Sequence, residues 1–300
     1  MSAAASLLYR PRTIKRDRRT KARIDLLDNQ IIGFVAEDHP TSVRHIFYRC
    51  VDPTVPEPVE KSNQTGYRHF QDRLVKLRRS GRIPYGCITD ATRYGYHTQT
   101  YRDQAEFLRS MKSLYRADLW ELSEYYCEVW CESRSIAGTI VDTCRELAVS
   151  LYPAGGFASL SLTYMAAEVI NQNSRGRPVV IFYVGDYDTA GVLIDASIER
   201  ELRQHLPADI QLEFIRLGIT SDQIKRYNLP TRPRKDGDRR SLHIHEVVEA
   251  EAMPPHILRN ILRRNIESLL PEAALQVAEV EEKSARDFFD RMADIMGEAA

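Results

Sequence analysis

One stretch of this chain constrains its fold more than any other. Six consecutive apolar residues, from Val179 to Val184, are followed at once by Gly185-Asp186-Tyr187-Asp188. A short run that is apolar at every position predicts a strand buried on both faces, as in parallel sheets. Ligands bind beyond the carboxyl ends of such strands. The two aspartates therefore follow the strand at the position where chemistry is expected.

Elements on both sides of this strand alternate in type. The periodicity predicts strands over residues 126–131 and 212–217, and helices over residues 136–150, 162–171 and 188–205. Alternating strands and helices imply right-handed crossovers and a parallel sheet covered on both faces. Residues 254–270 and 271–296 are helical by periodicity. We therefore expect an α/β domain over residues 121–300, with the last helices as an extension.

Three carboxylates are candidate metal ligands. Glu132 directly follows the 126–131 strand, and the D-x-D spacing lets Asp186 and Asp188 face one ion. Carboxylate oxygens at a low ligand count favour Mg²⁺ that retains waters, and such a cation relieves the repulsion between them. In a plainer interpretation, Asp188 only caps the following helix and the other two are solvated strand ends. For a bare D-x-D pair this plainer interpretation is favoured.

The first part of the chain has a different character. A helix is predicted over residues 13–36, and its first half carries a run of basic residues. This run is either part of a DNA-contacting arm, placed at residues 1–36, or a solvated helix start. It consists of Lys15, Arg16, Arg18, Arg19, Lys21 and Arg23. Short helices over 43–49 and from 65 to Gly81 precede a predicted strand pair near 87–93, and another helix spans 100–115. This order is typical of a winged helix-turn-helix, predicted over residues 37–120.

Charge and cysteine content narrow the class of protein. The net charge is zero, but residues 1–124 carry 22 Lys and Arg against 15 Asp and Glu, and the remainder 20 against 27. A basic first half suits an anionic polymer. Five cysteines without CxxC spacing indicate neither a disulfide framework nor a zinc site. No run approaches the length of a membrane span. We expect an intracellular, cytoplasmic and nucleoid-associated protein of bacterial or phage type.

The motifs around the carboxylates resemble a known family. Cys127-Glu128-Val129-Trp130-Cys131-Glu132 and Gly185-Asp186-Tyr187-Asp188-Thr189-Ala190-Gly191 look like the glutamate and DxD motifs of a TOPRIM domain. The segment Gly156-Phe157-Ala158-Ser159-Leu160-Ser161, with Leu217-Gly218-Ile219-Thr220 and Tyr227-Asn228-Leu229-Pro230, resembles the topoisomerase VI A subunit and its compact phage and bacterial relatives. The meiotic double-strand-break transesterase belongs to the same group. The resemblance covers roughly residues 41–255.

This resemblance implies a nucleophile. The family has a tyrosine within an Arg-x-Ile-Tyr/Phe-Tyr pattern, and Arg44-His45-Ile46-Phe47-Tyr48 matches it. Tyr48 would attack DNA and leave a 5′-phosphotyrosyl bond, with Arg44, one helical turn earlier, stabilising the phenolate or the phosphate. Without that pattern, Tyr48 would be taken as a packing residue. The family also implies Mg²⁺, double-stranded DNA as substrate and a homodimer that pairs the tyrosine of one subunit with the metal site of the other.

Some positions depart from the family or stay open. Ser133-Arg134 stands where family members often have a lysine, so Arg134 would have to make any phosphate contact there. Further candidates are DNA contacts from Lys235, Arg239 and Arg240, outer carboxylates at Glu249 and Glu251, and a metal site at His243 and His245. A basic surface loop is the simpler account of the three basic residues, and exposed loop histidines are commoner than a metal site. Without a Walker-type glycine loop, ATP-driven strand passage would need a separate ATPase subunit of the B type.

Three functions follow, in order of preference. The first is a type IIB topoisomerase A-subunit-like enzyme that cleaves DNA by tyrosine transesterification. The second is a TOPRIM hydrolase in which water attacks the phosphate. The third is a dimeric DNA-binding protein that keeps the sheet for assembly alone.

Overall fold

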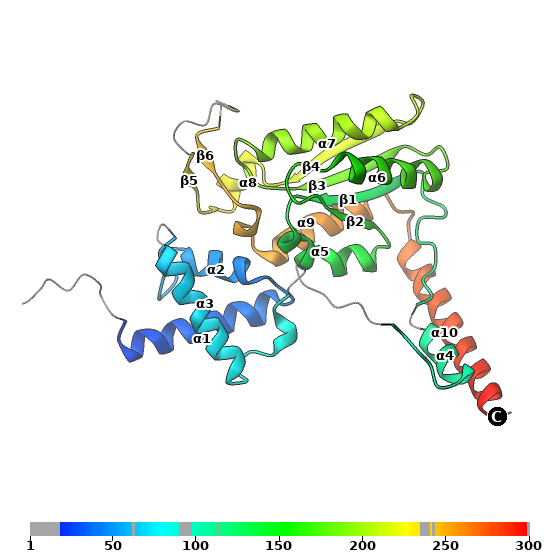
Figure 1. Ribbon diagram of the computed structural model, residues 1–300, viewed down its shortest axis with the longest axis horizontal. Coiled ribbons are helices and arrows are strands. Elements are labelled where there is room, and N and C mark those ends of the chain that lie inside the picture. Colours follow the sequence, from blue (N-terminus) through cyan, green and yellow to red (C-terminus); the bar gives the residue numbers. More distant parts are fainter. Residues whose placement is uncertain are drawn as a thin grey trace, which may run out of the picture.

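The computed structural model describes residues 19–61, 64–89, 98–112, 114–234, 241 and 244–298. Figure 1 shows a helical part, a sheet with helices on it, and a pair of helices that projects from the body. The helical part contains α1 (Lys21–Asp38), α2 (Val43–Val51), α3 (Gln64–Arg79) and the 3₁₀ turn η1 (Tyr85–Cys87). The projecting pair consists of α4 (Gln104–Met111) and α10 (Ala274–Glu298). The rest of the chain builds the sheet and its layers.

The sheet confirms the predicted α/β class. Its strands are β1 (Tyr126–Cys131), β2 (Ser150–Pro153), β3 (Val179–Val184) and β4 (Leu212–Gly218). They pair in the order β2-β1-β3-β4, and every pairing is parallel. The fully apolar strand β3 is central and buried at every position. This is the placement that its lack of alternation predicts.

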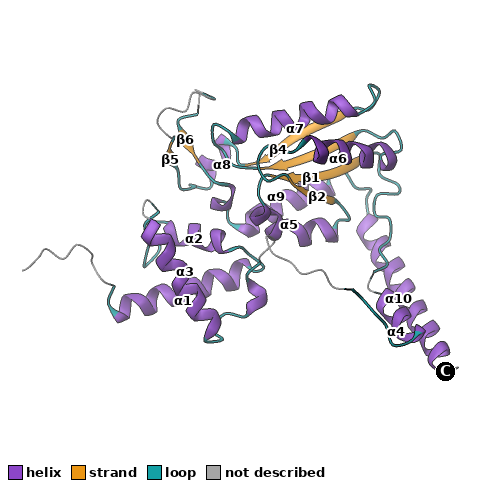
Figure 2. Ribbon diagram, viewed as in Figure 1, coloured by secondary structure: helices purple, strands orange, loops and turns teal. Residues whose placement is uncertain are grey.

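Helices cover both faces of the sheet (Figure 2). These helices are α5 (Arg134–Glu146), α6 (Leu160–Asn173), α7 (Gly191–His205) and α9 (Pro255–Glu267). Alternate side chains of β3 point to opposite faces. Val180 and Phe182 pack in one cluster with residues of α5 and α9, whereas Ile181 and Tyr183 pack in another with residues of α6 and α7.

The predicted helix over 136–150 is wrong at its end. Helix α5 ends at Glu146, and Ala148 takes a left-handed φ of 51° that turns the chain. The next residues form β2, a strand that sequence reasoning missed. Also missed were the short helix α8 (Ser221–Arg226), the turn η2 (Ala250–Ala252) and the antiparallel pair β5 (Arg232–Pro233) and β6 (Glu246–Val247). These elements are two to six residues long, too short for periodicity to reveal.

The N-terminal part has the predicted helices, while most of the predicted strand pair lies outside the described residues. Within the described residues up to Thr89, Ile88 forms only a single parallel bridge with Thr41; residues 90–97 lie outside the described part. Helix α1 begins at Lys21, because the Thr20 side chain accepts a hydrogen bond from the Arg23 N–H. The predicted start near residue 13 lies outside the described residues. The apolar faces of α1, α2 and α3 join the same cluster as α5 and α9.

The basic run at the start of α1 is partly neutralised. Glu57 accepts hydrogen bonds from Arg19 Nε at 2.6 Å and from Arg23 Nε at 2.9 Å. These donors outweigh burial and lower the pKa of Glu57 below its usual range. Lys15, Arg16 and Arg18 lie outside the described residues. The two arginines of the run that the structure places are therefore engaged within the chain.

Helices α4 and α10 pack side by side, and the C-terminus lies at the end of α10 (Figure 1). Ion pairs cross between residues far apart in sequence: Arg109 Nη2 lies 3.2 Å from Asp294 Oδ1, and Lys112 Nζ lies 3.1 Å from Asp290 Oδ1. The part of the chain predicted as a winged-helix domain thus contributes α4 to a contact with the last helix. Across the described ranges, we find no helix with the length and apolarity needed to cross a membrane.

Candidate active site

Glu132 directly follows β1, at the carboxyl end of the strand. Its N–H donates to the Val184 carbonyl at 2.9 Å, so the strand pairing continues to this residue. Its carbonyl accepts from the N–H groups of Gly155 and Gly156, which hold the following loop beside the strand. The carboxylate Oε2 accepts from the Asp186 N–H at 2.9 Å. Backbone contacts therefore connect the glutamate to the D-x-D loop.

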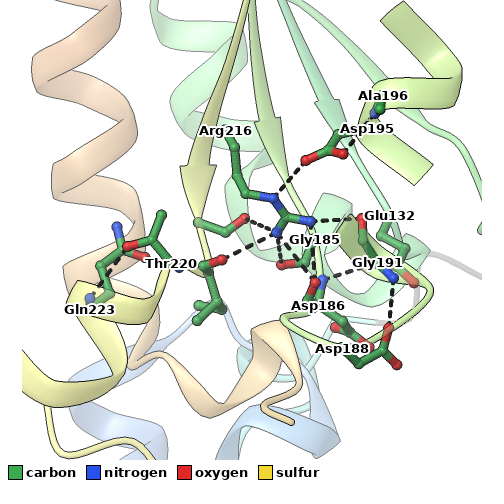
Figure 3. A network of polar contacts seen from close by, with 12 residues as sticks. Glu132, Gly185, Asp186, Asp188, Gly191, Asp195, Ala196, Arg216, Thr220 and Gln223 are labelled. Atoms are coloured by element: carbon green, nitrogen blue, oxygen red, sulfur yellow. Dashed lines mark hydrogen bonds and ion pairs between the residues drawn. The ribbon is translucent and has the colours of Figure 1, made fainter. Parts of the chain in front are cut away.

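The two aspartates of the loop have different surroundings (Figure 3). Asp186 Oδ1 accepts from the Ala250 N–H at 2.8 Å. Asp188 Oδ1 accepts from the N–H groups of Ala190 at 2.9 Å and Gly191 at 2.6 Å, at the start of α7. Asp188 therefore caps the helix, as in the plainer interpretation. Helix α7 begins at Gly191 and not at residue 188.

Electrostatics link all three carboxylates. Burial, followed by repulsion from Glu132, raises the pKa of Asp186 to about 8. Burial also raises the pKa of Glu132, and the charges of Asp188 and Glu251 act in the same direction. Carboxylates that raise one another's pKa in this way gain from a shared cation. The predicted ligands are thus close enough for their charges to act on one another.

Arg216 holds this loop in shape, although sequence reasoning assigned it no role. Its guanidinium donates to Asp195 Oδ2 at 2.7 Å and to the Gly191 carbonyl at 2.7 Å. It also donates to the carbonyls of Gly185, Asp186, Gly218 and Ile219. These contacts tie β4 to the loop after β3 and to α7 (Figure 3). The only signal in the sequence was one arginine within an otherwise largely apolar strand.

Gly191 is required by the same loop. A Cβ atom there would lie 2.2 Å from the Asp186 carbonyl oxygen, which real side chains do not tolerate. At Gly185, a Cβ atom would meet the Tyr183 ring at 2.6 Å. Both glycines of the quoted motif are therefore explained by close approach of neighbouring atoms.

Tyr48 and Arg44 lie one turn apart on α2, as predicted. The Tyr48 hydroxyl lies close enough to Arg44 and Glu249 for both to act on its pKa, and Arg44 Nη2 forms an ion pair with Glu249 Oε2. Tyr48 is only 5% exposed, whereas the Arg44 side chain is 50% exposed. Burial, followed by Glu249, raises the pKa of the Tyr48 phenol well above its usual value near 10. Its contact is therefore with Glu249 rather than with the predicted ligands.

The segment around η2 joins the tyrosine to the carboxylates. Val248 and Tyr187 exchange backbone hydrogen bonds of 2.9 and 2.8 Å, so this segment pairs with the D-x-D loop. Glu249 then reaches Tyr48, while Glu251 Oε1 accepts from Ser133 Oγ at 3.2 Å. The two glutamates that were only candidate outer carboxylates thus flank the site. In the sequence, two glutamates separated by one residue did not by themselves indicate a place beside the site.

The remaining candidates contribute less. Arg134 is exposed at the start of α5, and His245 is exposed before β6. Lys235, Arg239, Arg240 and His243 lie outside the described residues.

Magnesium suits the chemistry of the donors, but the side chains do not form a complete set. Among the described residues, no group of three His, Cys, Asp or Glu side chains is arranged to hold a metal ion. The described hydrogen bonds leave Glu132 Oε1 and Asp186 Oδ2 without a donor. Two such oxygens, with water, match the low protein-ligand count of Mg²⁺. Asp188 binds the start of α7 through Oδ1 alone, so the described hydrogen bonds leave its Oδ2 without a donor as well.

Comparisons with models of protein families, with curated proteins and with solved structures found no match for this chain.

Proposed function

We propose that the protein cleaves double-stranded DNA by tyrosine transesterification in the presence of Mg²⁺, as a type IIB topoisomerase A subunit does. One observation carries the proposal: a segment paired with the D-x-D loop brings Glu249 into an ion pair with Arg44 and close enough to Tyr48 to act on its pKa. A phenol, a guanidinium and clustered carboxylates from distant parts of the chain meet in one place. These are the groups that a transesterase acting on phosphodiesters needs.

The reaction assigns a task to each group. The Tyr48 oxygen attacks phosphorus and loses its proton, the bond from phosphorus to the 3′ oxygen breaks, and that oxygen leaves as a hydroxyl once protonated. Arg44 donates to the phenolate or to the phosphate oxygens and offsets their charge. Glu132 and Asp186 would hold Mg²⁺, which neutralises and positions the phosphodiester. The number of ester bonds is conserved, so the break can be resealed.

We further propose that the protein acts as a homodimer. Exposed apolar side chains lie after β2 and on α6, close to the loop that is hydrogen-bonded to Glu132; they include Phe157, Leu160, Tyr164 and Met165. Exposed apolar groups beside a polar site are typical of protein interfaces. The resemblance to the topoisomerase VI A subunit also implies a separate ATPase subunit for strand passage.

The test is a covalent adduct assay. Supercoiled and end-labelled DNA is incubated with protein and Mg²⁺, the reaction is stopped with detergent, and DNA linked to protein is measured on gels. We expect an adduct that Tyr48→Phe abolishes and that Asp186→Asn and Glu132→Gln reduce at least about a hundredfold. Tyr67→Phe is the matched control, because Tyr67 packs on the same Phe47 ring at 4.8 Å. An adduct that persists in Tyr48→Phe would contradict the assignment.

A metal-dependent hydrolase is the second candidate, and the burial of Tyr48 favours it. In that case water replaces the phenol as nucleophile, and cleavage survives Tyr48→Phe without protein remaining on the DNA. The same gels separate the two reactions. Binding without cleavage in every variant would instead leave only the DNA-binding role.

A further inference from the structure

Three cationic side chains converge on the carboxylate of Glu249. Arg44 pairs with one oxygen, and Arg232 Nη1 lies 3.4 Å from the other. Lys61 is close enough for Glu249 to act on its charge, and its Nζ lies 4.7 Å from the centre of the Tyr48 ring. All three cations therefore lie around the Glu249 carboxylate, and two of them, Arg44 and Lys61, also lie beside Tyr48.

These cations come from separate elements that fix them in place. Arg44 is on α2, Lys61 lies in the loop before α3, and Arg232 is on β5. Lys61 Nζ also donates to the Pro230 carbonyl at 3.2 Å, which ties that loop to the chain just before β5.

The exposure of the partners is unequal. The Glu249 side chain is 9% exposed, while those of Arg44 and Arg232 are 50% and 44% exposed. The carboxylate is thus covered, and the cations remain open to solvent on their outer side. An anion that arrives from solvent meets the guanidinium groups before it meets Glu249.

The chemistry of the donors also suits an anion. The three cations lie near Glu249. One of them, Arg44, is also within electrostatic reach of the more distant Glu251. A carboxylate and a phosphodiester each present two oxygens that accept from a guanidinium in parallel. Glu249 therefore occupies the position of a phosphate group, with its oxygens directed at the same donors and at the Tyr48 hydroxyl.

We infer that Arg44, Lys61 and Arg232 form an anion-binding site beside Tyr48, which Glu249 occupies in this conformation and which a DNA phosphodiester takes when Glu249 is displaced. The site explains why the phenol is buried in this conformation. Glu249 acts as an internal competitor that covers the tyrosine until DNA binds. The assignment of the phosphodiester as the scissile one rests on the proposed function, whereas the competition does not.

The experiment measures DNA affinity without catalysis. A short fluorescein-labelled duplex is titrated with the full chain in EDTA, and anisotropy is recorded over a series of salt concentrations. We expect Glu249→Gln and Glu249→Ala to bind about tenfold more tightly than the parent protein, because the competing charge is removed. Lys61→Gln and Arg232→Gln should bind about tenfold more weakly and reduce the salt slope by about 0.9 for each lost contact.

Glu246→Gln is the matched control, since it removes the same charge from an exposed residue of the neighbouring β6. Equal affinity of Glu249→Ala and Glu246→Gln would overturn the inference, as would unchanged binding by both Lys61→Gln and Arg232→Gln. Circular dichroism of each variant establishes that it is folded. Because binding is measured in EDTA, a missing covalent adduct refutes only the proposed function, and a missing gain in affinity refutes only the anion site.

Discussion

The carboxylate side and the tyrosine side of this site are held in different ways. Glu132 and Asp186 accept backbone N–H groups, and Arg216 fixes the loop through carbonyl oxygens of three segments. Tyr48, in contrast, packs in the hydrophobic core, and the groups that act on its hydroxyl are the paired side chains of Arg44 and Glu249. Backbone contacts cannot be exchanged without unfolding the loop, whereas ion pairs can be replaced by another ion. The comparison indicates a fixed side and an exchangeable side.

The largest effect is expected on the fixed side. Arg216→Gln removes an ion pair with Asp195 and most of the hydrogen bonds to surrounding carbonyl groups, which are left partly buried. We expect a loss of about 3–5 kcal/mol in the free energy of unfolding, measured by urea denaturation. Arg200→Gln, on the exposed surface of α7, is the control and should change stability by less than about 0.5 kcal/mol. Similar values for the two variants would remove the distinction between the sides.

The second-largest effect on stability is expected at Glu128, in the interior of β1. Glu128 is fully buried and accepts from Tyr126 Oη and Trp130 Nε1, each at 3.0 Å. Burial raises the pKa of Glu128 to about 7 in the folded protein, from 4.5 for an ordinary glutamate. The folded chain therefore holds the proton more tightly than the unfolded chain. The resulting stabilisation is complete below pH 4.5 and is lost as the pH rises through 7.

The corresponding prediction uses the difference between the parent protein and Glu128→Gln. As the pH rises from about 4.5 to about 7, the variant should gain up to about 3 kcal/mol relative to the parent. A constant offset is also expected, because a glutamine cannot accept from both ring donors with its amide oxygen alone. Thermal or urea unfolding at several pH values provides the measurement, with the exposed Glu213→Gln as control. A difference that does not vary with pH would show that Glu128 is not held protonated.

The smallest effect is expected on the exchangeable side. Tyr48→Phe removes one hydroxyl but leaves Arg44 and Glu249 paired with each other, so neither loses its partner. Unfolding should change by less than about 1 kcal/mol, although the adduct described above should disappear. Loss of several kcal/mol in this variant would place Tyr48 among the residues that hold the fold, and would weaken the comparison between the two sides.

The sequence predicted the sheet well because its strands have simple patterns. The bounds of β1 and β3 match the predicted strands, since β3 is apolar at every position and β1 is apolar at every position but Glu128. The carboxylates at the ends of these strands followed from the same patterns. The TOPRIM and winged-helix assignments stay predictions, as do the metal and the reaction.

What the sequence could not predict depends on contacts between distant residues. Arg216 has its role because Asp195 and the carbonyls after β3 surround it, and no local pattern encodes that arrangement. Glu249 meets Arg44 across 205 positions in the chain. Asp188 combines two candidate roles, and only the placement of the Gly191 N–H shows that it caps α7. Tertiary contacts therefore decided the part of the site that periodicity left open.

The packing of α4 against α10 has a consequence for the order of folding. Helix α4 has eight residues, too few to be stable in water without a partner. Its ion-pair partners lie far along the chain: Asp290 is 178 positions after Lys112, and Asp294 is 185 positions after Arg109. The strands of the parallel sheet lie within residues 126–218 and are therefore synthesised before those partners. We therefore expect α4 to become ordered only after the strands of the sheet have been synthesised.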